Sequence, residues 1–217
     1  MAEVIDSIRK RLDNSFEPRR GLDFGCGVGR LSIPMASICG SMVAADVSEF
    51  MIEEARENCR INGITNVEFA VSDDQLSRIS GTFDFINSFL VFQHIPRTRG
   101  VAIFSRLLGL LEDGGVGVFH FTYYRHTSEI LRLIYWARKS LPFANLLANL
   151  ILRRPFNQPM LEMNEYRLND ILRAVQESKC DLSHIDFSID YIPYETALGV
   201  MIFCQKKKSK IWTSGAE

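Results

Sequence analysis

The chain has 217 residues, of which 47% are hydrophobic and 24% are charged, and its formal net charge is −1. This length suits a single α/β domain over 1–217 with a modest insertion, and the composition allows a full buried core. A net charge so close to zero excludes the broad electrostatic field that attracts nucleic acid, so no nucleic-acid partner is expected.

Strands and helices are expected to alternate along the chain. Apolar spacing predicts a helix over 2–12, a strand over 21–24, a helix over about 30–38, a strand over 41–45 and a helix that Ser48 caps and Asn62-Gly63 ends. Further strands are expected over 67–71, 83–87 and 116–121, with a helix over about 99–111, and then a helix over 168–175 and closing strands over 182–189 and 197–204. This alternation predicts a mostly parallel sheet with helices on both faces.

The cysteines and the apolar runs indicate the cellular compartment in which the protein is expected. The five cysteines are scattered and odd in number, so neither a disulfide framework nor a zinc site is expected. The residues around Glu3 and Asp6 lack the apolar run of a signal peptide, and the run from Leu141 to Leu152 is too short and too polar to span a bilayer. A cytoplasmic protein with reduced thiols and no metal is therefore expected.

The turn after the first predicted strand is rich in glycine. Residues 25–29 carry glycine at every second position, which lets the backbone turn tightly and approach a ligand. About twenty residues later Asp46 ends the second strand, where a carboxylate accepts hydrogen bonds from both hydroxyls of a ribose. A dinucleotide site needs its third glycine at the position of Arg30. The carboxylate of Asp23 also suits an ammonium better than a pyrophosphate, so the pattern favours a ligand with an amino-acid end.

Five segments follow one another in order and with ordinary spacing: residues 22–31, 43–48 with Met51, Ala55 and Arg56, 69–73, 83–88 and 110–115. Together they resemble the motifs of the class I S-adenosylmethionine-dependent methyltransferase family between Gly21 and Phe121. The resemblance implies a Rossmann-like fold with a seven-stranded sheet and S-adenosyl-L-methionine as cofactor. It also implies an enzyme that methylates a small or medium-sized acceptor at oxygen, nitrogen or carbon.

The resemblance also implies roles for single residues. Asp23 would favour the methionine ammonium, Gly25 and Gly27 would offer backbone groups to it within a loop that includes Cys26, and the Asn87 carbonyl would help to hold it. Asp46 would bind the ribose, and Val47 and Met51 would pack on the adenine. Asp73 would accept a hydrogen bond from the adenine amino group, and the amide of Asp74 would face a ring nitrogen.

Methyl transfer to a protonated acceptor needs a base, and His94 is the strongest candidate because it follows the fourth strand by a few residues. A histidine that caps or packs a short helix is the alternative. One or two of the residues at the end of the fifth strand are expected to line the acceptor pocket; these are His120, Tyr123, Tyr124 and His126. Tyr166 is expected in the core.

Residues 124–163 break the alternation and predict a helical insertion over the carboxyl ends of the strands. Basic and aromatic side chains interleave in it: Arg125, Arg132, Tyr135, Trp136, Arg138, Lys139, Phe143, Arg153 and Arg154. Three interpretations stay open, namely a lid, a homodimer contact, and a surface for a peripheral membrane or lipid-linked acceptor. For the whole chain, the alternatives to an enzyme are a non-catalytic S-adenosylmethionine-binding or scaffold module and, more distantly, a dehydrogenase.

Overall fold

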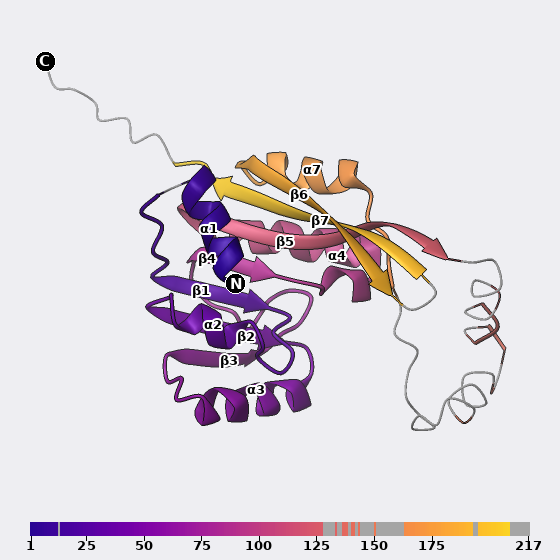
Figure 1. The fold of residues 1–217 in the computed structure, drawn as a ribbon, viewed down its shortest axis with the longest axis horizontal. Coiled ribbons are helices and arrows are strands. Elements are labelled where there is room, and N and C mark those ends of the chain that lie inside the picture. Colours follow the sequence, from indigo (N-terminus) through magenta and orange to yellow (C-terminus); the bar gives the residue numbers. More distant parts are fainter. Residues whose placement is uncertain are drawn as a thin grey trace, which may run out of the picture.

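The computed structural model describes residues 1–12, 14–127, 163–192 and 195–208, with a few positions between them (133, 136–138, 140, 141, 143 and 150). These residues form a seven-stranded sheet in the order β3-β2-β1-β4-β5-β7-β6 (Figure 1). The strands are β1 Arg20–Phe24, β2 Ser41–Asp46, β3 Val67–Val71, β4 Phe83–Ser88, β5 Leu111–Thr127, β6 Cys180–Ile192 and β7 Glu195–Lys206. All neighbours are parallel except β7, which is antiparallel to β5 and to β6. The predicted Rossmann-like, mostly parallel sheet is confirmed.

Helices cover both faces of this sheet. They are α1 Ala2–Arg11, α2 Ser32–Ala36, α3 Glu49–Ile61, the short 3-10 helix η1 Phe92–His94, α4 Arg97–Gly109 and α7 Leu168–Glu177. Along β2, Met42 belongs to a core cluster with α1 and α2 and Ala44 to one with α3, whereas Val43 and Ala45 belong to the core cluster that contains α4 and α7. Because successive side chains of a strand point to opposite faces, these contacts place three helices on one face and two on the other.

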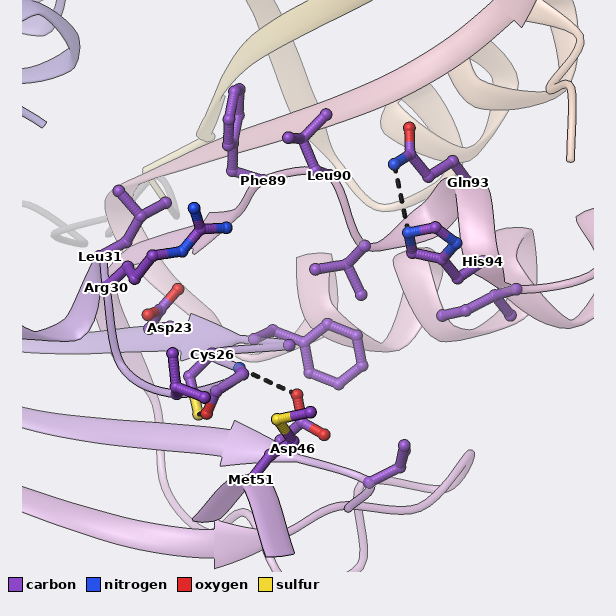
Figure 2. Close-up of a pocket in the computed structure, with 17 residues that line it drawn as sticks. Asp23, Cys26, Arg30, Leu31, Asp46, Met51, Phe89, Leu90, Gln93 and His94 are labelled. Atoms are coloured by element: carbon purple, nitrogen blue, oxygen red, sulfur yellow. Dashed lines mark hydrogen bonds between the residues drawn. The ribbon is translucent and has the colours of Figure 1, made fainter. Parts of the chain in front are cut away.

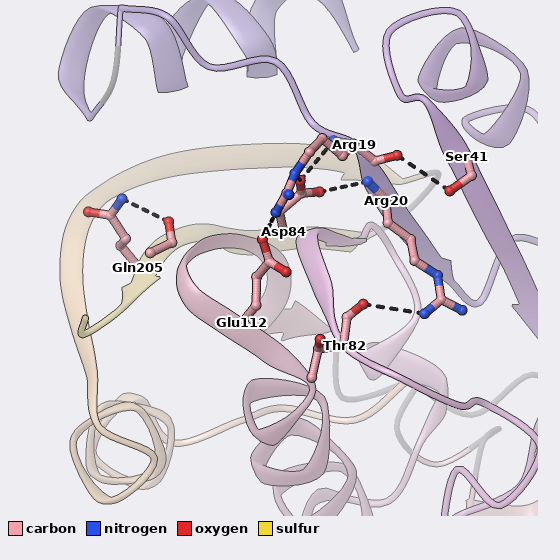
Figure 3. Close-up of polar contacts among 8 residues, drawn as sticks. Arg19, Arg20, Ser41, Thr82, Asp84, Glu112 and Gln205 are labelled. Carbon is pink, nitrogen blue, oxygen red and sulfur yellow. Dashed lines mark hydrogen bonds and ion pairs between the residues drawn. The ribbon is translucent and has the colours of Figure 1, made fainter. Parts of the chain in front are cut away.

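The amino ends of the parallel strands are held together by a polar network (Figure 3). The carboxylate of Asp84 on β4 accepts hydrogen bonds from the backbone amides of Arg19 (2.8 Å) and Arg20 (2.9 Å). The Arg19 side chain also pairs with Glu112 of β5. These contacts tie β1, β4 and β5 together at the edge of the sheet that lies away from the glycine-rich turn.

The starts of the helices follow local chemistry. The Ser48 hydroxyl accepts a hydrogen bond from the Met51 amide (3.3 Å), as the predicted cap requires. The helix predicted over about 99–111 begins earlier, at Arg97, because the carbonyl of Pro96 already accepts a hydrogen bond from the amide of Gly100 (2.9 Å). The helix predicted over about 30–38 is shorter, since residues 30 and 31 still belong to a turn in which Gly29 has a φ of 84°.

β5 is longer than predicted, and this corrects the expected start of the insertion. Residues 124–127 continue β5, because β7 pairs with them as far as Thr127 opposite Glu195. The turn at residues 113–115 lies inside the strand as an irregularity between the pairs Phe83–Leu111 and Phe85–Val116. Most of the remaining insertion lies outside the described residues. Within the described ranges, no helix combines the length and apolar character needed to cross a bilayer.

Candidate cofactor and acceptor site

A cavity of about 800 Å³ lies beyond the carboxyl ends of β1, β2 and β4 (Figure 2). From β1 the chain continues to β2 and β3 on one side, whereas β4 leads to β5 on the other, so the loops after β1 and β4 diverge here. Ligands of open α/β sheets bind at such a switch point. The cavity is lined by residues 23–28, 30, 31, 46, 47, 51, 89–91 and 93–95. Its volume falls within the usual range for small-molecule sites.

The glycine-rich turn forms one wall of this cavity and is fixed to β2. The backbone amides of Gly25 and Cys26 both donate to the carbonyl oxygen of Ala45, at 2.7 and 3.0 Å. Gly25 has a φ of 75°, and a Cβ at this position would lie 2.3 Å from Cγ2 of Val91. Glycine is therefore required here both by the backbone conformation and by the close approach of the loop after β4.

Asp46 lies at the end of β2 with its carboxylate held by backbone groups. The amide of Gly27 donates to Oδ2 (3.0 Å), and the amide of Ser48 donates to Oδ1 (2.9 Å). A carboxylate has about four acceptor sites, so each oxygen keeps a lone pair for a ligand after these two bonds. Val47 and Met51 line the cavity beside it, with 71% and 37% of their surface exposed.

Asp23 lines the same cavity but is only 2% exposed. Its carboxylate accepts hydrogen bonds from the Ser32 hydroxyl (2.6 Å) and from the Asn87 side-chain amide (3.3 Å). Burial raises the pKa of Asp23 to about 6, the negative charge of Asp46 adds to this, and the two hydrogen bonds oppose it. Ion pairs to Asp23 are absent from the described part of the chain, so its charge has hydrogen-bond donors but no cation.

Three residues predicted to contact the cofactor do not line the cavity. Asn87 is buried behind Asp23. The Asp73 carboxylate accepts from the amides of Gln75 (3.0 Å) and Ser77 (2.9 Å) and from the Ser77 hydroxyl, which lowers its pKa. The Asp74 carboxylate forms a two-bond ion pair with Arg99, at 2.8 Å for each bond, which also lowers its pKa.

His94 lies in η1 and lines the cavity from the β4 side. Its Nε2 is 3.2 Å from the side-chain nitrogen of Gln93, whose side-chain oxygen accepts from the Thr122 hydroxyl (3.1 Å). The Gln93 carbonyl accepts from the amide of Asn164 (2.6 Å). The turn that carries His94 is thus held by β5 and by the segment that precedes α7.

The aromatic residues expected near the acceptor have different surroundings. His120 is 2% exposed and packs against Phe89, with ring centroids 5.2 Å apart, so it lies behind the wall that Phe89 forms. Tyr123, Tyr124 and His126 are not among the lining residues. Tyr166 is 1% exposed and donates to the Ile95 carbonyl (2.8 Å), as expected of a core residue.

The structure adds lining residues that the sequence analysis did not select. Most belong to the loop after β4: Phe89, Leu90, Val91, Gln93 and Ile95. Their position after the strand next to β1 was the available signal, since both strands end at the switch point. Arg30 also lines the cavity, although its position at a predicted helix start favours neither a ligand role nor a structural one.

Comparison with known proteins identifies a domain within the chain. Residues 22–115 match the model of a methyltransferase domain. The magnesium protoporphyrin IX methyltransferase of Synechocystis PCC 6803, solved with bound SAH, shares the fold with a TM-score of 0.64 at 19% identity, over 94% of this chain and 82% of that chain. Residues 22–115 of the chain form a methyltransferase domain. The cavity occupies the part of the fold that contains the family's motifs.

Two curated relatives illustrate the range of similar proteins. The ubiquinone biosynthesis O-methyltransferase of Parvibaculum lavamentivorans is 34% identical over 101 residues, which is 46% of this chain and 39% of that protein. The 23S rRNA (uracil(1939)-C(5))-methyltransferase RlmD of Marinomonas posidonica is 34% identical over 76 residues, which is 35% of this chain and 17% of that protein. The chain therefore spans well under half the length of either relative.

Proposed function

We propose that this chain transfers the methyl group of S-adenosylmethionine to a small or medium-sized acceptor. The observation that carries the proposal is the carboxylate of Asp46, which two backbone amides orient at the edge of a cavity at the switch point of the sheet. A ribose with two free hydroxyls satisfies the lone pairs that remain on this carboxylate. A cationic group of a ligand would stabilise the buried negative charge of the Asp23 carboxylate.

Different residues of the cavity are proposed to contact different parts of this cofactor. Asp46 binds the ribose, Val47 and Met51 offer an apolar surface to the adenine, and the loop with Gly25, Cys26 and Gly27 lies between the ribose and Asp23. Asn87 acts on the ammonium through Asp23, whose carboxylate it helps to orient. The adenine contacts of Asp73 and Asp74 stay predictions. The Asp73 carboxylate already accepts hydrogen bonds from Gln75 and Ser77, whereas the ion pair of the Asp74 carboxylate with Arg99 does not involve the Asp74 backbone amide.

S-adenosylmethionine supplies an activated methyl group, so the protein must align the acceptor, exclude water and remove a proton where the acceptor carries one. Positioning of this kind contributes roughly 7–11 kcal/mol at best. His94 lines the half of the cavity away from Asp46 and is the proposed base, with a typical effect of about 10²–10⁴-fold. The apolar wall formed by Phe89, Leu90 and Ile95 suits an acceptor with an apolar body.

A small acceptor is favoured over RNA by the charge of the chain. Binding to RNA relies on basic residues that neutralise phosphates, whereas this chain has a net charge of −1. The similarity to an rRNA methyltransferase covers only 17% of that protein. A reaction with tritiated S-adenosylmethionine, offered a small-molecule extract or total RNA, separates the two acceptors by the fraction that becomes labelled.

The cofactor site is tested by titration calorimetry with S-adenosylhomocysteine. Wild type is expected to bind, and Asp46→Ala to bind at least about tenfold more weakly, because both ribose hydroxyls lose a charged acceptor. Glu53→Ala, which removes an exposed carboxylate from the same stretch of chain, is the matched control. Absence of binding to wild type, or equal binding by Asp46→Ala, would refute the proposed site. Binding without methylation of any acceptor would favour the non-catalytic module.

A further inference from the structure

The two edge strands of the sheet differ in how they are protected from pairing with other chains. β3 has five residues, carries the exposed charge of Glu68, and has the guanidinium of Arg56 over the ring of Phe69, 4.9 Å from its centroid. β6 has 13 residues, and among the described strands it pairs only with β7. Short length and charged side chains are usual protections of an edge strand, so β3 is protected and the long β6 is less so.

The second half of β6 is the open part of this edge. A register shift between Leu182 and His184 interrupts the first half, and Ile185 still packs on the core cluster that contains α7. Further along, Phe187 and Ile189 are 67% and 57% exposed, and in Figure 1 the strand runs on past the end of α7. Large apolar side chains therefore stand at the surface beside the unpaired flank of the strand.

The side chains of β6 alternate between its two faces, so apolar and polar residues separate. One face carries Ile185, Phe187 and Ile189, and the other carries His184, Asp186 and Ser188. A two-fold axis perpendicular to the sheet brings a second copy of the strand alongside in antiparallel orientation, with like faces on the same side. With this axis at Phe187, each Phe187 ring meets its own counterpart, and each Ile185 lies opposite an Ile189.

The polar face is compatible with the same register. Asp186 would lie opposite Ser188 of the second copy instead of opposite another carboxylate. The hydroxyl oxygen of Ser188 is shielded from solvent and has no hydrogen-bond partner within the described residues, so a carboxylate opposite it supplies an acceptor. An axis at Asp186 would instead set two like charges directly opposite each other, which is unfavourable. The charges of the strand thus favour the axis at Phe187.

We propose that β6 pairs antiparallel with β6 of a second copy of this chain, so that two sheets join into one. The backbone groups on the open flank supply hydrogen bonds, and the apolar face supplies the side-chain contacts. The Phe187 ring already packs against Tyr123, with ring centroids 6.0 Å apart, so it loses little freedom on association. The cavity beyond β1, β2 and β4 is separated from this edge by β5 and β7.

The test is sedimentation equilibrium of wild type, Phe187→Lys, Phe187→Asp, an equimolar mixture of these two variants, and Ile61→Lys. Ile61 ends α3, which packs on β3 at the other edge of the sheet, and it is 66% exposed, so its variant is the matched control. Circular dichroism melting curves show that each variant stays folded, as expected for substitutions at exposed positions.

Wild type and Ile61→Lys are expected to form the same dimer. Phe187→Lys and Phe187→Asp are each expected to weaken it at least about tenfold, because an aromatic contact is lost and like charges meet at the axis. The mixture is expected to recover a dimer, because a lysine and an aspartate then oppose each other across the axis. This recovery is specific to a register in which residue 187 faces itself.

Three results would overturn the inference. A monomeric wild type would show that the edge stays unpaired or is covered by the stretch between residues 127 and 163. A dimer that both Phe187 variants leave intact would place the contact on another surface. Two monomeric variants whose mixture also stays monomeric would exclude the two-fold axis at Phe187.

Discussion

Asp23 is a carboxylate whose burial opposes its negative charge. Its pKa of about 6 lies above the ordinary value of 3.8, mainly because of burial. A carboxyl group with a raised pKa in the folded state contributes stability that is present below pH 4 and is lost as the pH rises through 6. The unliganded protein is therefore expected to carry a destabilising charge at neutral pH.

Asp23→Asn is expected to remove this cost. Its free energy of unfolding relative to wild type should rise by about 3 kcal/mol between pH 4 and pH 7.5, since a shift of about two pH units corresponds to that energy. The new amide can donate one hydrogen to the Ser32 hydroxyl oxygen, while its own oxygen still accepts from the Asn87 side chain. Urea unfolding at both pH values measures the difference, and a difference that stays constant with pH would contradict the raised pKa.

The same residue makes ligand binding depend on pH. Below about pH 6 Asp23 becomes neutral and no longer attracts an ammonium, so S-adenosylhomocysteine should bind more weakly at pH 5 than at pH 7.5. Asp23→Asn should flatten this profile in titration calorimetry. A profile that keeps its shape in the variant would assign the pH dependence to another group.

Single residues differ in how far the sequence could predict their part in the site. The place of Asp23 and Asp46 in the cavity lining was predictable from their spacing around the glycine-rich turn, and their ligand roles stay predictions. The hydrogen-bond partners of Asp73 and Asp74 could not be predicted from the sequence. Ser77 reaches Asp73 because of the path of the loop after β3, and Arg99 reaches Asp74 because of the position of α4.

The loops after β1 and β4 meet at the cavity, and their close contact requires glycine at position 25. Gly25→Ala places a Cβ 2.3 Å from Val91 and imposes a φ of 75° on alanine, so we expect a loss of about 3 kcal/mol or more. Gly27→Ala has a φ of 52° but no heavy atom within 4 Å of its Cβ, and should cost only about 1–2 kcal/mol. Urea unfolding of both variants gives the comparison, and equal losses would mean that the two loops do not constrain each other.

The loop that carries His94 is fastened to the core by Tyr166. Tyr166→Phe removes the hydrogen bond to the Ile95 carbonyl and should lower the free energy of unfolding by about 1 kcal/mol. Tyr124→Phe, at a side chain that is 48% exposed, should stay within about 0.5 kcal/mol of wild type. Chemical unfolding of the two variants checks this, and a neutral Tyr166→Phe would show that the turn is held by other contacts.

The elements of the first half were predictable from their own residues, because each strand is short, apolar and bounded by turn residues. The length of β5 was not predictable in this way. Residues 122–127 are polar and aromatic, and they extend the strand because β7 offers them backbone partners. Pairing of that kind is decided between distant segments, so boundaries set by it do not show in a local pattern.

Ligand binding is expected to raise the melting temperature of the whole molecule. A ligand at about 100 times its dissociation constant adds about 2.7 kcal/mol, which corresponds to roughly 5–10 °C for a chain of this size. S-adenosylhomocysteine is therefore expected to raise the melting temperature and NAD to leave it unchanged. Differential scanning fluorimetry separates the outcomes, and a shift with NAD alone would favour the dehydrogenase.

The order of the strands in the sheet has a consequence for folding during synthesis on the ribosome. β7 comes last among the described strands in the sequence, yet it lies between β5 and β6. As the chain leaves the ribosome, the long flank of β5 stays without its neighbour until β7 has been translated, and β6 has no partner strand before then. Unpaired strand edges favour pairing with other chains. The nascent protein is thus expected to be most exposed to aggregation after β6 and before β7 emerges, when the cavity loops have already been made.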